Sequence, residues 1–102
     1  LGTALVVDDI VDTGGTLAKV AEALKQAGAR QGLASCSHGV LSGLAMAKIE
    51  EAPLSKLIVT DSIPPAAEEG RSGKIVVLSI AELMAKAIRN IHEEASVTSL
   101  FV

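Results

Sequence analysis

The stretch ALVVDDIVDTGGT, residues 4–16, decides the fold of this chain. Its uninterrupted apolar run, Ala4–Val7, is typical of a strand buried in a parallel sheet. Two acids follow that run, and a Thr/Gly loop then leads directly into a helix-period pattern. We therefore expect a strand at residues 3–8, a tight loop, and a helix over about residues 16–27 that ends at Gly28.

The rest of the chain continues the alternation of strand and helix. Such alternation predicts an α/β fold, a parallel sheet with right-handed crossovers and helices on both faces. The last helix carries an apolar stripe that we expect to face inward: Ile80, Leu83, Met84, Ala87, Ile88 and Ile91. The other expected elements are strands at 32–37, 56–60 and 74–78, a short helix after Ser42, a mobile loop at 61–73, a Ser79–Glu82 capping box, and an edge strand at 96–102.

Asp8 and Asp9 come at the carboxyl end of the first expected strand. Ligands of open α/β sheets bind beyond this end of the strands. Because neighbouring side chains of a strand point to opposite faces, the two acids are expected to do different work. One would accept hydrogen bonds from the vicinal hydroxyls of a sugar such as ribose. The other would hold a divalent cation through water or bond the loop backbone.

The loop at residues 12–16 suits a phosphate monoester. Gly14 and Gly15 permit positive φ and leave room for phosphate oxygens, so successive N–H groups can converge on an anion. Thr13 and Thr16 add hydroxyl donors, and the following helix adds its free N–H groups. Asp12 is expected to accept N–H bonds within the turn.

Spacing excludes two better-known phosphate loops. Lys19 lies on the helix three residues beyond Thr16, so it is not placed as the lysine of a P-loop. The pattern G-x-G-x-x-G is absent from the sequence. A plain strand–turn–helix is the simpler reading, but folding alone does not call for paired acids beside a Thr/Gly loop.

Four motifs resemble known enzymes. VVDDIVDTGGTL at 6–17 resembles the phosphoribosyl-pyrophosphate-binding signature of the type I phosphoribosyltransferase fold. SHGVLSG at 37–43, LIVTDSIP at 57–64 and SVTSLF at 96–101 resemble the C-terminal part of ribose-phosphate pyrophosphokinases. The first motif is shared with phosphoribosyltransferases, and the later ones separate the synthetases from them.

This resemblance implies transfer of diphosphate from MgATP to ribose 5-phosphate, giving phosphoribosyl pyrophosphate and AMP. It implies that Asp8 binds ribose hydroxyls, with Asp9 as the second acid of the motif. Ser96 and Thr98 match a tail that helps build an anion-binding allosteric site at a subunit interface in one class of these enzymes. The 5-phosphate pocket would be formed by Asp12, Thr13, Gly14, Gly15 and Thr16.

In the family, an N-terminal domain with ATP-binding and Mg²⁺-binding residues and a basic flexible loop precede this region. We therefore expect residues 1–102 to be one C-terminal, ribose-5-phosphate-binding domain that is inactive alone. Most Mg²⁺ ligands are expected outside it, and ATP is a substrate of the complete enzyme only. Two alternatives stay open: a non-catalytic regulatory homologue of the synthetase, and a phosphoribosyltransferase.

Composition agrees with one small α/β domain. The 102 residues are 49% hydrophobic with a mean hydropathy of +0.46, so some apolar surface is expected to face a missing domain or another subunit of a homo-oligomer. A net charge of −3 argues against a nucleic-acid partner. The sequence has no membrane span or signal peptide in view, and the single Cys36 fits a cytoplasmic setting.

Several residues outside the motif at 4–16 have a structural interpretation beside a functional one. Cys36 is expected to be buried and inert, and Met84 to belong to the core. His38 is expected to be a loop histidine bonded to backbone, with a ligand contact as the alternative. Ser42 either caps a helix or borders an anion. Lys74 either lies in a solvated loop or steers anions.

Overall fold

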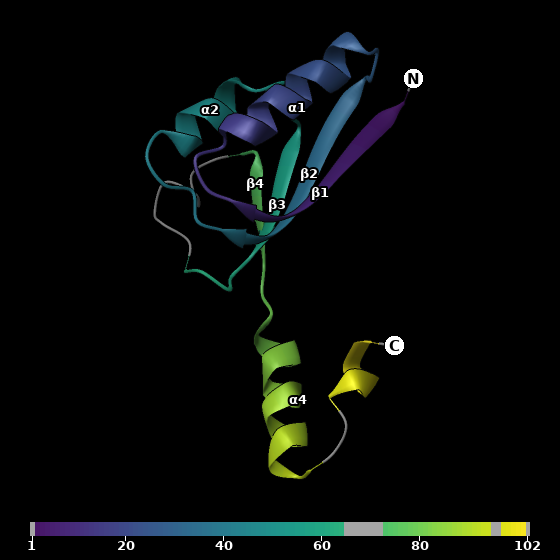
Figure 1. Ribbon diagram of the computed structural model, residues 1–102, viewed down its shortest axis with the longest axis vertical. Coiled ribbons are helices and arrows are strands. Elements are labelled where there is room, and N and C mark those ends of the chain that lie inside the picture. Colours follow the sequence, from purple (N-terminus) through teal and green to yellow (C-terminus); the bar gives the residue numbers. More distant parts are fainter. Residues whose placement is uncertain (1, 65–72, 95–96, 102) are drawn as a thin grey trace.

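The computed structural model describes residues 2–64, 73–94 and 97–101. Its sheet has four parallel strands in the order β1-β2-β3-β4 (Figure 1). The α/β class and the parallel sheet are therefore confirmed. The elements are β1 (Thr3–Val11), α1 (Gly15–Gln26), β2 (Gln31–Gly39), α2 (Ala45–Glu51), β3 (Lys56–Thr60), β4 (Ile75–Leu78), α4 (Ala81–His92) and the 3-10 helix η1 (Thr98–Phe101).

The core lies between the sheet and the pair of helices α1 and α2, which cover one of its faces (Figure 1). Leu57 and Val59 of β3 are fully buried there, as is Ile49 of α2. Small and branched aliphatic side chains fill this layer because the chain has a single aromatic residue. The other core members are Val11, Leu17, Ala21, Ala34, Cys36, Ala52, Leu54 and Ile75.

The prediction of helices on both faces differs from the structure. Helix α4 leaves the end of β4 and extends away from the sheet, and its main packing partner among the described elements is η1 (Figure 1). None of its residues is buried, so Met84 is not a core residue and the expected inward stripe does not join the core. Amphipathicity shows that a helix needs a partner surface, but it does not show which surface that is.

The detached helix makes the molecule long and thin. Its extents are 51 × 32 × 19 Å and its Cα radius of gyration is 15.9 Å. A compact domain of about 100 residues has a radius of gyration of about 13 Å. None of the helices in the described part of the chain is long and apolar enough to cross a membrane.

Three predicted local features differ from the structure: the end of the first strand, the capping box and the form of the tail. β1 continues to Val11, so the two acids lie inside the strand and not at its end. The capping box does not form, since Ser79 Oγ accepts from the Ala81 N–H at 3.1 Å while Glu82 pairs with Lys86 at 3.0 Å. The tail forms η1 beside α4 instead of an edge strand. Ser96 and most of the expected loop at 61–73 lie outside the described residues.

Candidate functional site

The two acids of β1 each turn one carboxylate oxygen onto the backbone. Asp8 Oδ1 accepts from the Asp9 N–H at 2.8 Å, and Asp9 Oδ1 accepts from the Ile10 N–H at 2.8 Å. Both side chains are exposed, and Asp8 stands opposite Cys36 of β2 in the parallel register. The two side chains also interact with each other, so the paired acids form one exposed polar cluster on β1.

The two acids influence each other and their neighbours. The Asp8 side chain and the Ile10 N–H hold the pKa of Asp9 below its ordinary value, and His38 contributes a smaller lowering. Burial raises the pKa of the Cys36 thiol, and the negative charges of Asp8 and Asp9 raise it further. Cys36 is thus buried, as predicted, and its raised pKa favours the protonated thiol.

Gly14 is the residue of the loop whose backbone conformation requires glycine. Its φ is +80°, and it is the residue before the first turn of α1. A Cβ here would lie 3.5 Å from the Ala45 carbonyl oxygen and 3.6 Å from Ile49 Cγ1, because α2 packs directly on the loop. Positive φ was expected at both glycines, but Gly15 does not adopt it. The requirement for glycine is therefore strongest at Gly14.

The start of α1 presents backbone N–H groups and threonine hydroxyls as hydrogen-bond donors. The first bond of the helical ladder runs from the Ala18 N–H to the Gly14 carbonyl at 2.9 Å, so the N–H groups of residues 15–17 precede that ladder. Thr13 Oγ1 lies 3.5 Å from the Gly15 nitrogen, and the side chains of Thr13 and Thr16 are exposed. These groups form the kind of helix start that binds a phosphate.

One pocket of about 230 Å³ joins the loop to Asp8. It contains five of the seven residues predicted to bind ribose 5-phosphate and leaves out Asp9 and Gly15. Its floor is apolar and comes from β1, β2 and α1. The lining residues are Val6, Asp8, Ile10, Val11, Asp12, Thr13, Gly14, Thr16, Leu17, Val20 and Cys36.

Asp12 has a different partner from the one expected. The Ser42 hydroxyl donates to Asp12 Oδ1, and the Ser42 N–H donates to the Asp12 carbonyl at 3.0 Å. Asp12 therefore ties the phosphate-type loop to the segment that follows β2. Ser42 lies ahead of α2 but does not cap it, because Leu44 occupies the cap position without a side-chain bond.

Lys48 of α2 lies beside the loop although it does not line the pocket, and the sequence did not indicate this position. Its Nζ lies 3.8 Å from the position of a Cβ on Gly15, so a cation stands beside the loop. No local pattern links Lys48 to residues 12–16. Only the packing of α2 on the loop brings the two together.

His38 lies inside β2 and not in a loop. Its Nδ1 is 2.7 Å from Ser62 Oγ, so its partner is a hydroxyl and not the backbone. Ser62 Oγ also donates to the Ser37 carbonyl at 3.2 Å, and Thr60 Oγ1 donates to the same carbonyl at 2.5 Å. This polar cluster joins the carboxyl ends of β2 and β3 near the paired acids.

Lys74 has a structural role. Its Nζ donates to the carbonyls of Ile49, Glu50 and Ala52 at 3.1, 2.7 and 2.9 Å, at the end of α2. A cation there complements the negative end of the helix dipole. The alternative in which Lys74 steers anions is therefore not supported.

A second pocket of about 340 Å³ lies at the amino ends of the strands, between Arg30 and Ser55. It contains neither the paired acids nor the Thr/Gly loop. Since ligands of parallel sheets bind at the carboxyl ends, the pocket at Asp8 is the candidate site. Among the described residues, no group of three or more His, Cys, Asp or Glu side chains is placed to hold a metal ion.

Comparison with known proteins gives consistent matches. Residues 2–102 match the model of the phosphoribosyl synthetase-associated domain. Ribose-phosphate pyrophosphokinase 1 of Listeria monocytogenes is 52% identical over 97 residues, which are 95% of this chain and 30% of that protein. The ribose-phosphate pyrophosphokinase of Vibrio parahaemolyticus is 45% identical over 95% of this chain and 31% of its own length.

A solved structure agrees with these sequence matches. The crystal structure of phosphoribosylpyrophosphate synthetase from Mycobacterium smegmatis superposes with a TM-score of 0.86 and 36% identity. The match covers 91% of this chain and 31% of that one. The chain thus spans about a third of the length of the proteins it resembles.

Proposed function

The chain belongs to the phosphoribosyl synthetase-associated domain family, and from this premise we propose that it is the ribose-5-phosphate-binding domain of a ribose-phosphate pyrophosphokinase. The complete enzyme would transfer diphosphate from MgATP to ribose 5-phosphate and release AMP. The observation that carries the proposal is the pocket that Asp8 shares with Asp12, Thr13, Gly14 and Thr16. The names of the relatives support the same reaction.

The pocket offers different chemistry at its two ends. At the loop, the N–H groups of Thr16 and Leu17 that precede the helical ladder, the hydroxyls of Thr13 and Thr16 and the start of α1 would bind the 5-phosphate. The Lys48 ammonium would offset part of the phosphate charge. At the strand, the exposed carboxylate of Asp8 would accept hydrogen bonds from ribose hydroxyls.

The fit for Mg²⁺ is partial. Asp8 and Asp9 are exposed and each has only one carboxylate oxygen bonded to the backbone, whereas the described residues offer no larger ligand group. Mg²⁺ commonly keeps several waters and uses one or two carboxylates together with substrate phosphates. Asp9 would thus hold the ion through water, and the nucleotide phosphates and residues outside this chain would supply its other ligands. When bound, the ion would neutralise phosphate charge.

We place the chain in the C-terminal part of the complete subunit, as its motifs suggest. Reading the gene on both sides of this segment tests the placement. An ATP-binding domain encoded ahead of the segment supports it. Such a domain encoded only behind the segment would instead make the chain the N-terminal region of the subunit.

We also propose a cytoplasmic location, supported by the unpaired thiol of Cys36.

An NMR titration with ribose 5-phosphate tests the pocket assignment. We expect the amides of residues 13–17 to shift with an affinity of about millimolar, because a small ligand on part of a site gains only ~4 kcal/mol. Inorganic phosphate should move the loop amides, and ribose 5-phosphate should in addition move the Asp8 and Asp9 amides. Unmoved loop amides at high ligand concentration in a folded sample would refute the assignment.

A further inference from the structure

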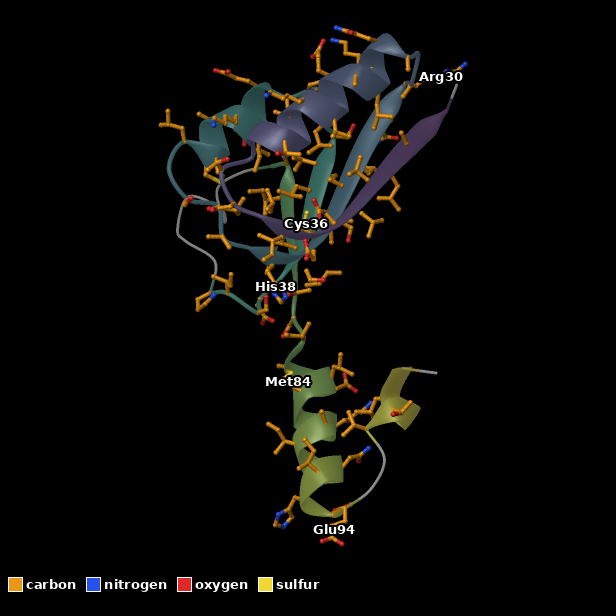
Figure 2. The ribbon with its side chains drawn as sticks, in the orientation of Figure 1. Arg30, Cys36, His38, Met84 and Glu94 are labelled. Carbon is orange, nitrogen blue, oxygen red and sulfur yellow. The ribbon has the colours of Figure 1, made fainter. Side chains whose placement is uncertain are left out.

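The segment at residues 40–42 holds the start of the phosphate-type loop. It follows β2, which ends just beyond His38 (Figure 2). The first two N–H groups of the segment donate to the Val11 carbonyl at 2.9 and 3.2 Å, and the third donates to the Asp12 carbonyl at 3.0 Å. Three successive amides therefore fix the backbone at the point where β1 becomes the loop.

A left-handed turn directs these amides toward the loop. Leu41 has a φ of +51° and Gly43 has a φ of +61°. Positive φ is unfavourable for a leucine, and such a conformation persists only where the surrounding contacts impose it. The Leu41 side chain is half-buried and packs against the core, which offsets this strain. The turn is thus a fixed support for the residues it bonds.

The Ser42 side chain adds a bond to the side chain of Asp12. Its hydroxyl donates to Asp12 Oδ1, and bonds to an ionised carboxylate are stronger than bonds between neutral groups. Asp12 lines the pocket together with Thr13 and Gly14, whereas Ser42 lies outside that lining. Any effect of the Ser42 hydroxyl on the pocket therefore passes through Asp12.

The charge of Asp12 is unfavourable beside a phosphate. Asp12 is the acid at the loop end of the pocket, and Asp8 is the acid at its strand end. A carboxylate turned toward a bound phosphate repels it. The Ser42 hydroxyl instead turns one Asp12 oxygen toward the segment after β2, outside the pocket. On the other side of the loop, α2 packs on Gly14.

We propose that Ser42 is a positioning residue for phosphate binding. Its hydroxyl holds the Asp12 carboxylate away from the phosphate, and its N–H holds the loop backbone in the conformation that binds. Ser42 itself makes no contact with the ligand. This role presupposes the proposed function, because it concerns the phosphate end of the same pocket.

A double-mutant cycle followed by NMR titration with ribose 5-phosphate tests this role. Ser42→Ala should raise the dissociation constant by about 5- to 10-fold, because the Asp12 carboxylate is no longer held. Ser42→Thr keeps a hydroxyl and should stay within about twofold of the unchanged chain. In the Asp12→Ala background, Ser42→Ala should change the dissociation constant by less than about twofold, because the contact through which it acts is already gone.

Ser55→Ala is the matched control. Ser55 lies at the amino ends of the strands, beside the other pocket, so its loss should leave the dissociation constant unchanged. Ser42 is exposed, and its variants should keep their fold by circular dichroism. Ser42→Cys, a weaker donor of similar size, should give an intermediate loss and serves as the test if Ser42→Ala does not fold.

A measurement without ligand separates the failure of this role from the failure of the proposed function. NMR relaxation dispersion should show more microsecond-to-millisecond exchange at the amides of residues 13–17 in Ser42→Ala than in the unchanged chain or in Ser42→Thr. If the unchanged chain does not bind ribose 5-phosphate, the proposed function fails, and equal loop dynamics in all three proteins would also refute the positioning role. If the unchanged chain binds, equal binding by Ser42→Ala, or the same loss with and without Asp12, would overturn the positioning role alone.

Discussion

At the scale of single residues, Gly14 shows how one backbone angle shapes the site. Replacing it with alanine forces a residue with a Cβ onto a φ of +80°, while the Cβ itself, 3.5 Å from the Ala45 carbonyl oxygen, would make ordinary contact. We expect Gly14→Ala to lower the free energy of unfolding by about 1–2 kcal/mol, the usual penalty for a left-handed non-glycine residue. Urea denaturation followed by circular dichroism measures this change.

Gly15→Ala is the matched control. Gly15 lacks positive φ, and a Cβ there meets its nearest atoms at 3.8 Å, which is ordinary contact. The substitution should leave stability within about 1 kcal/mol and is expected to increase it slightly, because alanine restricts the unfolded chain. Equal losses from the two substitutions would show that the backbone of Gly14 is not the special one.

A substitution of Lys48 tests whether this single residue contributes to ribose 5-phosphate binding. We expect Lys48→Met to weaken ribose 5-phosphate binding by about 3- to 10-fold, because a charge near 4 Å from a phosphate in high dielectric is worth about 1 kcal/mol. Lys25→Met removes the same charge from the far end of α1 and should change affinity little. The difference between the two variants should shrink in high salt. NMR titration measures both affinities, and equal weakening would argue against a local role for Lys48.

At the scale of elements, the junction between β4 and α4 depends on Asp61. The Ile80 N–H and then the Ser79 hydroxyl hold the pKa of Asp61 below its ordinary value. A lowered folded pKa means that this carboxylate stabilises the junction above the unfolded value, about 3.9. That contribution is lost as the pH falls through the folded value.

We therefore predict that the Ile80 amide becomes less protected from hydrogen exchange as the pH is lowered from 6 to below about 4, beyond the intrinsic change in exchange rate. Asp61→Asn keeps an acceptor oxygen but removes the titrating group, so its Ile80 protection should not change with pH in this window. Parallel pH profiles for the two proteins would mean that another group controls the junction.

The sequence predicted some helices and strands correctly and others not. The apolar run before the paired acids and the helix period after the Thr/Gly loop predicted β1 and α1, because both signals are local. The stripe of α4 predicted an amphipathic helix correctly but not its place in the fold. The tail at Thr98–Phe101 became a 3-10 helix beside α4, where an edge strand was expected.

At the scale of the whole molecule, the chain spans 30% of the length of Listeria ribose-phosphate pyrophosphokinase 1. We predict that it binds ribose 5-phosphate but forms no AMP from ATP. Phosphoryl transfer depends on cations that neutralise and position the transferring group, and among the described residues Lys48 places one cation beside this loop. A coupled assay for AMP measures the activity, and turnover by this chain alone would contradict the prediction.

The same assay on the complete subunit separates the functions that the motifs leave open. AMP formation supports the pyrophosphokinase. Folded, ligand-binding protein without AMP formation supports a regulatory homologue. Release of pyrophosphate from phosphoribosyl pyrophosphate in the presence of a base supports a phosphoribosyltransferase.

By itself, the sequence determined the parallel α/β architecture, the paired acids on β1 and the Thr/Gly loop, because hydrophobic period and loop composition act over short stretches. Ser96 and Thr98 remain an untested allosteric prediction. The tertiary structure alone decided that Asp8 lines the pocket, that Ser42 holds Asp12, that Lys48 stands beside the loop, and that α4 leaves the sheet. These outcomes depend on contacts between distant segments, and no local pattern specifies which two surfaces meet.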